Sequence, residues 1–202
     1  MQHQVEVPVK RLLAALFLAT ALVAQPSVGL KLGDACPPFS LPGIDGQAHG
    51  PLASTPLMVV FPSTECPYVL ATQARINAYA KKFAGKIVVL GINPNDLDTH
   101  AKESMADMQV QAKGQGFVFA YLKDEAQLVT RAFGAVCTPD FFLFDGSRKL
   151  VYRGRMDDSW RDPSKVQVRD LEAATEALLA GKTVSADQPA SRGCSIKWKP
   201  VP

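Results

Sequence analysis

Short apolar stretches that are typical of buried strands alternate with helix-like stretches along most of this chain. The expected strands are residues 57–61, 87–92, 117–122, 141–144 and 149–153, the last two joined by an Asp145-Gly146 turn. The expected helices are residues 67–83, 98–111 and 125–133, and a final helix before Gly181 with Val168, Leu171, Leu178 and Leu179 on its inner stripe. This order predicts an α/β fold with a central mixed β-sheet flanked by helices.

Residues 30–56 precede the first buried strand and are rich in turn-forming residues. Asp45-Gly46 is a strong hairpin-turn signal. We therefore expect a lead-in hairpin beside the main sheet. At the helix expected from residue 98, Asp98 or Thr99 fits the N-cap position.

The N-terminus has the pattern of an export signal. Lys10 and Arg11 precede an uncharged apolar run over residues 12–24. Its length suits a signal peptide, residues 1–29, cleaved after Ala24 or Gly29; an uncleaved single-helix anchor is the alternative. The sequence thus predicts a periplasmic or secreted protein with a domain over residues 30–181 and a tail over residues 182–202.

The composition and the absence of certain motifs limit the partners and cofactors that we expect. The net charge of +3 is small for 202 residues, so we expect no nucleic-acid partner. No glycine-rich phosphate loop follows a strand, and we expect no cofactor. His49 and His100 stand alone, without a Cys or His at ligand spacing, so we expect no metal.

Cys66 lies between the first buried strand and the first long helix. Unpaired backbone N–H groups and the helix dipole at such a position favour a thiolate over a thiol. Pro67 suits the first helical turn, where its missing N–H costs nothing. Glu65 opposes thiolate formation electrostatically. Cys66 is therefore the candidate reactive thiol, with an inert core cysteine as the alternative.

Three further segments follow Cys66-Pro67-Tyr68-Val69, and their order and spacing are informative. Thr138-Pro139 precedes the strand pair at residues 141–153, residues 137–145 read CTPDFFLFD, and residues 193–198 read GCSIKW. Together they resemble an exported peroxiredoxin-like (alkyl hydroperoxide reductase/thiol-specific antioxidant-like) branch of the thioredoxin superfamily, over roughly residues 31–199. The resemblance implies a thioredoxin fold and a cis Thr138–Pro139 bond, with that loop packed against the start of the cysteine-bearing helix. A trans proline opening a strand is the alternative.

The chain departs from the thioredoxin pattern at Ser63, where many relatives have a second cysteine. A disulfide within residues 63–66 is therefore impossible. Ser63 fits the peroxiredoxin arrangement, in which a hydroxyl three positions before the reactive cysteine helps to orient the peroxide. Peroxiredoxins also have a proline at the position of Val59 and an arginine near the thiolate, for which Arg153 and Arg155 are the candidates.

The remaining cysteines are candidates for a resolving or disulfide partner. The resemblance implies that Cys137 lies close to Cys66; a small buried residue is its alternative role. Cys194, on a tail expected to be flexible, is a candidate to resolve a Cys66 sulfenic acid in its own or another subunit. A structural disulfide of Cys194 with Cys36 is the alternative, since disulfides persist in exported proteins.

The sequence therefore favours a thiol-dependent redox protein with antioxidant activity, in which Cys66, Ser63, Thr138 and Pro139 form the catalytic site. Its expected partners are a peroxide or a protein disulfide as substrate, and a thioredoxin-like reducing thiol as donor. Disulfide exchange with exported proteins is the first alternative. A non-catalytic thioredoxin-fold binding module with structural cysteines is the second.

Overall fold

A five-stranded mixed β-sheet forms the centre of the molecule, in a computed structural model that describes residues 29–52 and 54–200. Its strand order is β5-β4-β3-β7-β8. The strands are β3 (Leu57–Val60), β4 (Val88–Asn93), β5 (Ala120–Lys123), β7 (Phe141–Phe144) and β8 (Leu150–Gly154). The first three are parallel, and β7 and β8 add antiparallel neighbours, as the sequence predicts.

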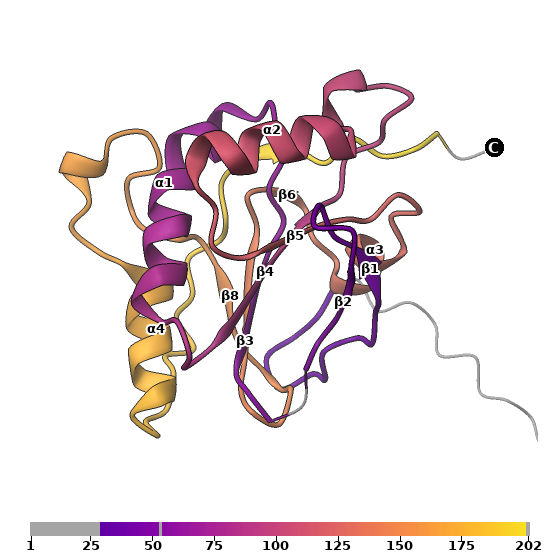
Figure 1. Ribbon diagram of the computed structural model, residues 1–202. Helices are drawn as coiled ribbons and strands as arrows, with labels where there is room; N and C mark the ends of the chain where they lie inside the picture. Colours follow the sequence, from indigo (N-terminus) through magenta and orange to yellow (C-terminus); the bar gives the residue numbers. More distant parts are fainter. Residues whose placement is uncertain (1–28, 53, 201–202) are drawn as a thin grey trace, which may run out of the picture.

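Helices cover both faces of this sheet (Figure 1). They are α1 (Pro67–Lys82), α2 (Met105–Gln115), α3 (Leu128–Phe133) and α4 (Asp170–Leu179), with short 3-10 turns at η1 (Ala101–Glu103) and η2 (Pro163–Lys165). Alternate residues of a strand point to opposite faces. Accordingly Met58 packs with α1 and α4, whereas Val59 packs with α3.

Among the described residues, four two-residue strands lie outside the central sheet. The lead-in hairpin pairs β1 (Leu41–Pro42) with β2 (Ala48–His49), as expected from the Asp45-Gly46 turn. A second pair joins β6 (Cys137–Thr138) to β9 (Cys194–Ser195). In Figure 1 the yellow C-terminal segment crosses the end of the sheet near α2 and β6. The prediction of a flexible tail is therefore wrong at Cys194, which is held in a strand.

Some helix details also differ from the sequence prediction. Helix α2 begins after Ser104, because the Ser104 hydroxyl accepts from the Asp107 N–H and the Asp107 carboxylate accepts from the Ser104 N–H. Neither Asp98 nor Thr99 is its N-cap. Val168 precedes α4 and is 48% exposed. Leu179 is 39% exposed, so only the middle of the predicted inner stripe faces the core.

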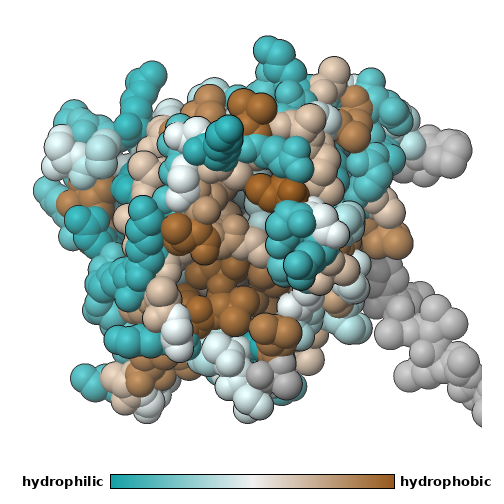
Figure 2. Space-filling model, in the orientation of Figure 1, coloured by the Kyte–Doolittle hydropathy of each residue, from teal (hydrophilic) through white to brown (hydrophobic). Residues whose placement is uncertain are grey.

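The surface view in Figure 2 shows an apolar hollow on the face drawn in Figure 1. An apolar groove runs between the C-terminal end of α1 and strand β2, with Ala84, Ile87 and Phe119 in its lining. None of the helices over residues 29–52 and 54–200 is long and apolar enough to cross a bilayer. The predicted signal region at residues 1–28 lies outside the described residues.

Candidate redox site

The loop between β3 and α1 fixes the position of Cys66, which is the N-cap residue of α1. The Ser63 hydroxyl accepts a hydrogen bond from the Cys66 N–H at 3.2 Å, and Pro67 opens the helix. The Thr64 N–H donates to Glu103 Oε2 at 3.0 Å. Both bonds hold the loop, so the Cys66 thiol lies at the helix N-terminus with only 5% of the residue exposed.

The Thr138–Pro139 peptide bond is cis, as the resemblance implies. It brings β6 against the start of α1: the Cys66 thiol donates to the Thr138 carbonyl oxygen at 2.9 Å. The hydroxyls of Ser63 and Thr138 lie 3.5 Å apart. The sequence-predicted residues Ser63, Cys66, Thr138 and Pro139 thus come together in one site.

Cys194 is the sulfur partner that the fold brings to Cys66. Strand β9 pairs with β6 in antiparallel register, with Cys194 opposite Thr138. The Sγ atoms of Cys194 and Cys66 are 2.7 Å apart, and both residues are free thiols in the structure. An additional approach of about 0.7 Å would give disulfide bonding distance. Burial, followed by the neighbouring Cys66 sulfur, raises the pKa of Cys194 to about 11, against an opposing effect of the Tyr68 N–H.

Cys137 lies in β6 beside this pair but makes a different contact. Its thiol donates to the Pro139 carbonyl oxygen at 3.5 Å. Burial, followed by the negative charge of Asp140, raises the pKa of Cys137 to about 12, while Arg153 opposes this rise. Cys137 is therefore near the site, as the resemblance implies, and in an environment that strongly disfavours its thiolate.

Cys36 is placed away from the other three cysteines. Its N–H donates to the carbonyl of Arg148 at the β7–β8 turn, the end of the hairpin opposite β6. Burial raises the pKa of Cys36 to about 11, partly offset by Arg148. The alternative of a Cys36–Cys194 disulfide is contradicted, because Cys194 lies on Cys66 at the other end of the sheet.

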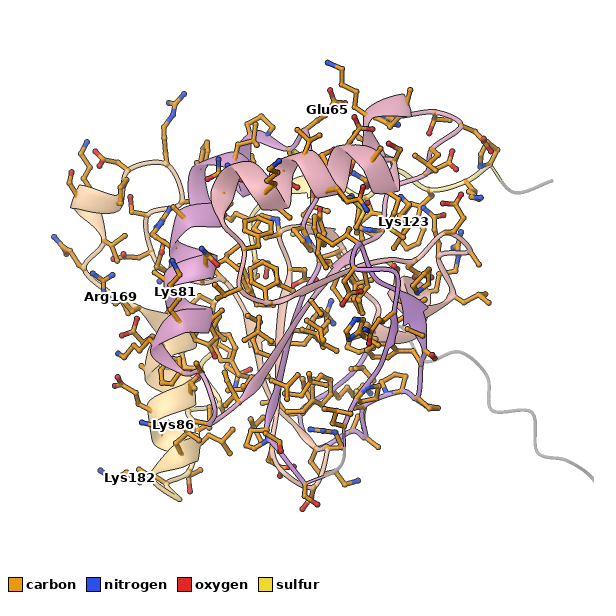
Figure 3. All side chains as sticks on the ribbon, viewed as in Figure 1. Glu65, Lys81, Lys86, Lys123, Arg169 and Lys182 are labelled. Atoms are coloured by element: carbon orange, nitrogen blue, oxygen red, sulfur yellow. The ribbon has the colours of Figure 1, made fainter. Side chains whose placement is uncertain are left out.

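The two candidate arginines make their ion pairs elsewhere. Arg153 reaches Asp140 at 3.5 Å and also donates to the Gly134 carbonyl, and Arg155 pairs with Asp170 at 2.7 Å. Within the described residues, neither guanidinium forms a hydrogen bond to Cys66. Glu65 is exposed at the rim of the molecule (Figure 3), 3.8 Å from Lys102.

A buried polar network under the site escaped prediction from the sequence. Glu103 is 1% exposed and accepts from Thr64 N, Asn93 Nδ2 and Asn95 Nδ2. The ammonium of Lys123, which points into the interior in Figure 3, donates to the Asn93 side chain and the Asn95 carbonyl. These residues join the loop before Cys66 to the ends of β4 and β5. No spacing rule identifies them, because each is an ordinary polar residue in a loop or strand.

The tail is bound to the same network. Asn95 Oδ1 accepts from the Lys197 N–H at 2.9 Å, and Gln127 Oε1 accepts from the Lys199 N–H at 2.8 Å. Trp198 lies under the Arg131 guanidinium, 4.4 Å from the ring centre. Among the described residues, no group of three or more His, Cys, Asp or Glu side chains is arranged to hold a metal ion.

A cysteine at a helix N-terminus beside a cis-proline loop, on a mixed sheet of this order, defines a thiol-dependent redox protein of the thioredoxin superfamily. The model of the AhpC/TSA family matches residues 32–153, more than half of the chain. The chain belongs to the AhpC/TSA family.

Solved structures share the fold of this chain. A hypothetical protein from Sinorhizobium meliloti 1021 is 38% identical, with a TM-score of 0.80, covering 85% of this chain and 96% of that one. An uncharacterized conserved protein from Geobacillus kaustophilus is 36% identical, with a TM-score of 0.80 and coverage of 85% and 94%. A peroxidoxin from Mycobacterium tuberculosis, 20% identical with a TM-score of 0.52 over 75% and 95% of the chains, shares the fold. No curated protein matches this chain.

Proposed function

We propose that this protein reduces peroxides with Cys66 as the attacking thiol and Cys194 as the resolving thiol. The observation that carries the proposal is the 2.7 Å separation of their Sγ atoms, each held by ordered backbone. Ser63 supplies no sulfur, so Cys194 takes the place of the second cysteine. The proposal also includes export of the protein, which rests on the pattern of residues 1–29.

The reaction would proceed in two steps. The Cys66 thiolate attacks one peroxide oxygen, the O–O bond breaks, and the other oxygen leaves as an alcohol or water after protonation. The Cys194 thiolate then attacks the Cys66 sulfenic sulfur, an S–S bond forms and the oxygen leaves as water. The two electrons lost by the thiols have gone to the peroxide, and an external dithiol, such as a thioredoxin-like donor, restores them.

The surrounding residues would fix the geometry of these steps. The Ser63 hydroxyl holds the Cys66 N–H, and Thr138 with Pro139 aligns the β6 backbone beside the thiol. Because Cys194 already lies on Cys66, the second step requires no rearrangement of the chain. A restricted opening, with Cys66 only 5% exposed, suits a small oxidant.

The second candidate function is thiol–disulfide exchange with other proteins. It is favoured by the placement of Arg153 and Arg155, the two candidate arginines, which pair with Asp140 and Asp170 and not with Cys66. The same pair of cysteines would serve either activity. The two activities differ in the oxidant that Cys66 accepts.

The test is reaction with one equivalent of hydrogen peroxide, followed by non-reducing peptide mapping. We expect a Cys66–Cys194 disulfide and consumption of the peroxide. In Cys194→Ser we expect a Cys66 sulfenic acid that a cyclic dione reagent labels. Cys36→Ser is the matched control and should form the same disulfide as the parent protein.

The negative outcomes of this experiment separate the alternatives. Absence of any oxidation at Cys66 would contradict the peroxidase, and rapid reduction of insulin by the reduced protein without peroxide turnover would favour exchange. If Cys66→Ser were indistinguishable from the parent in both assays, the cysteines would be structural and the chain a binding module.

A further inference from the structure

We propose that strand β9 fills the place beside Cys66 where the extended backbone of a protein disulfide would bind, and thereby restricts the oxidants that Cys66 attacks directly to small molecules. This inference rests on the proposed redox function of Cys66 and adds the substrate class. It makes residues 193–199 a specificity-determining segment in addition to the carrier of Cys194.

The first argument is the position of the sulfur. In thiol–disulfide exchange the attacking thiolate and the disulfide sulfur come into contact before a mixed disulfide forms. In this protein the space next to the Cys66 Sγ is taken by the Cys194 Sγ at 2.7 Å and by the Thr138 carbonyl oxygen at 2.9 Å. A cysteine of another polypeptide would have to occupy the position of Cys194.

The second argument is the backbone. An extended peptide binds a protein most readily by adding a strand to an exposed edge. The edge beside Cys66 is β6, and β9 already pairs with it, with Cys194 opposite Thr138 and Ser195 opposite Cys137. Strand β9 therefore has the position and direction that a bound substrate strand would need.

The third argument is the closeness of this pairing at Gly193. A Cβ atom added to Gly193 would lie 2.2 Å from the Thr138 carbonyl oxygen and 2.6 Å from its carbon. Contacts this short with backbone atoms cannot be relieved by turning a side chain. The close approach of the tail to β6 therefore requires glycine at position 193.

The fourth argument is the anchoring of the residues that follow β9. Ile196 is 5% exposed and packs in the core cluster on the α3 face. The Lys197 N–H donates to the Asn95 side chain. The Lys197 carbonyl accepts from the Asp96 N–H and from Gln127 Nε2. Each net hydrogen bond lowers the population of molecules with a displaced tail by about fivefold, so several together keep the tail bound.

A reducing protein can still reach the oxidised pair. Cys194 is partly exposed, whereas Cys66 is buried. A donor thiolate therefore attacks the Cys194 sulfur, the S–S bond breaks, and Cys66 leaves as a thiolate. The donor's second thiol then attacks its own sulfur in the mixed disulfide and releases Cys194, so the donor is oxidised and both cysteines are reduced.

The test compares a small and a polypeptide oxidant in a Cys194→Ser background, which keeps the strand and removes its sulfur. The small reagent is methyl methanethiosulfonate. The other is an extended peptide whose single cysteine carries a thionitrobenzoate group, and attack by Cys66 forms a mixed disulfide and releases the coloured thiolate. The measured quantity is the ratio of the peptide rate to the small-reagent rate.

The decisive variant is Gly193→Ala, which forces β9 away from β6. We expect it to raise the rate ratio by about tenfold or more, because the fraction of molecules with an open edge increases. Gly114→Ala is the matched control: an added Cβ at Gly114 meets nothing within 4 Å, so the ratio should not change. Circular dichroism establishes that both variants are folded.

If Gly193→Ala does not fold, Gln127→Ala replaces it, because it removes the bonds to Lys197 and Lys199 and leaves β6 intact. An unchanged ratio in the folded variant would overturn the inference, as would a Cys194→Ser protein that already reacts equally fast with both reagents. Failure of Cys66 to react with either reagent in any variant would instead overturn the proposed redox function.

Discussion

Oxidation of Cys66 and Cys194 should strongly stabilise the protein against unfolding. The two residues are 128 positions apart in the sequence, so their disulfide would close a very long loop. The chain-entropy relation for a loop of this length gives about 5 kcal/mol at 25 °C. For a domain of this size, that corresponds to an increase of about 10–20 °C in Tm.

The structure explains why most of the stabilisation calculated from loop closure should be observed. A disulfide stabilises a protein by restricting the unfolded chain, and the stabilisation is smaller where the disulfide also strains or orders the native state. Here the reduced tail is already ordered, because Ile196 is buried and Lys197 is hydrogen-bonded to Asn95. Closing the disulfide therefore adds little further order to the native protein.

The assay is thermal unfolding of the peroxide-oxidised and the fully reduced protein, with the disulfide mapped before each scan. Cys194→Ser is the control and should show no dependence on oxidation. A protein with the Cys66–Cys194 bond verified, but with a Tm within about 2 °C of the reduced form, would refute the reasoning, because the shift expected from loop closure is several times larger.

Three further outcomes are expected. Burial raises the pKa of Cys194, so the decay of a Cys66 sulfenic acid in rapid-quench labelling should become faster as the pH rises toward that pKa, by up to about tenfold per pH unit. A pH-independent decay would contradict a Cys194 thiolate as the nucleophile. Arg153→Met should lower the free energy of unfolding in urea at neutral pH by about 2–3 kcal/mol, because it leaves the buried Asp140 carboxylate without its cation. This value is smaller than for a fully buried pair, because the Arg153 side chain is 25% exposed. Burial raises the pKa of Asp140, so protonation of this carboxyl is favoured in the folded state. The loss of stability in Arg153→Met should therefore shrink as the pH falls through that pKa and grow as the pH rises through it. An equal loss at all pH values would exclude this explanation. Ile196→Ala should cost about 2–4 kcal/mol and increase proteolysis of the tail, and a neutral effect would show that the tail does not contribute to the core.

Local patterns account for the parts of the fold that the sequence predicts correctly. The apolar runs of β3, β4 and β7 are buried strands, and Pro67 opens the helix after Cys66. The cis Thr138–Pro139 bond came from the family resemblance, because the intrinsic preference of an X–Pro bond is trans.

Other features depend on competition or on distant contacts, which a local pattern does not contain. Asp98 and Ser104 are both good N-cap residues, and the reciprocal bonds with Asp107 place the start of α2 after Ser104. Val168 fits a helical stripe by spacing but lies before α4 and is exposed. The pairing of Cys194 with Thr138 joins residues far apart in the chain, and no spacing in the sequence predicts its register.

The replacement of a neighbouring cysteine by Ser63 also affects how the site is made. A partner three residues away would emerge from the ribosome almost together with Cys66, whereas Cys194 follows 128 residues later. At ordinary rates of synthesis, that separation is about 6–25 seconds. During this interval Cys36 and then Cys137 are the other thiols of the growing chain, so the proposed Cys66–Cys194 pair can form only after β9 has docked on β6.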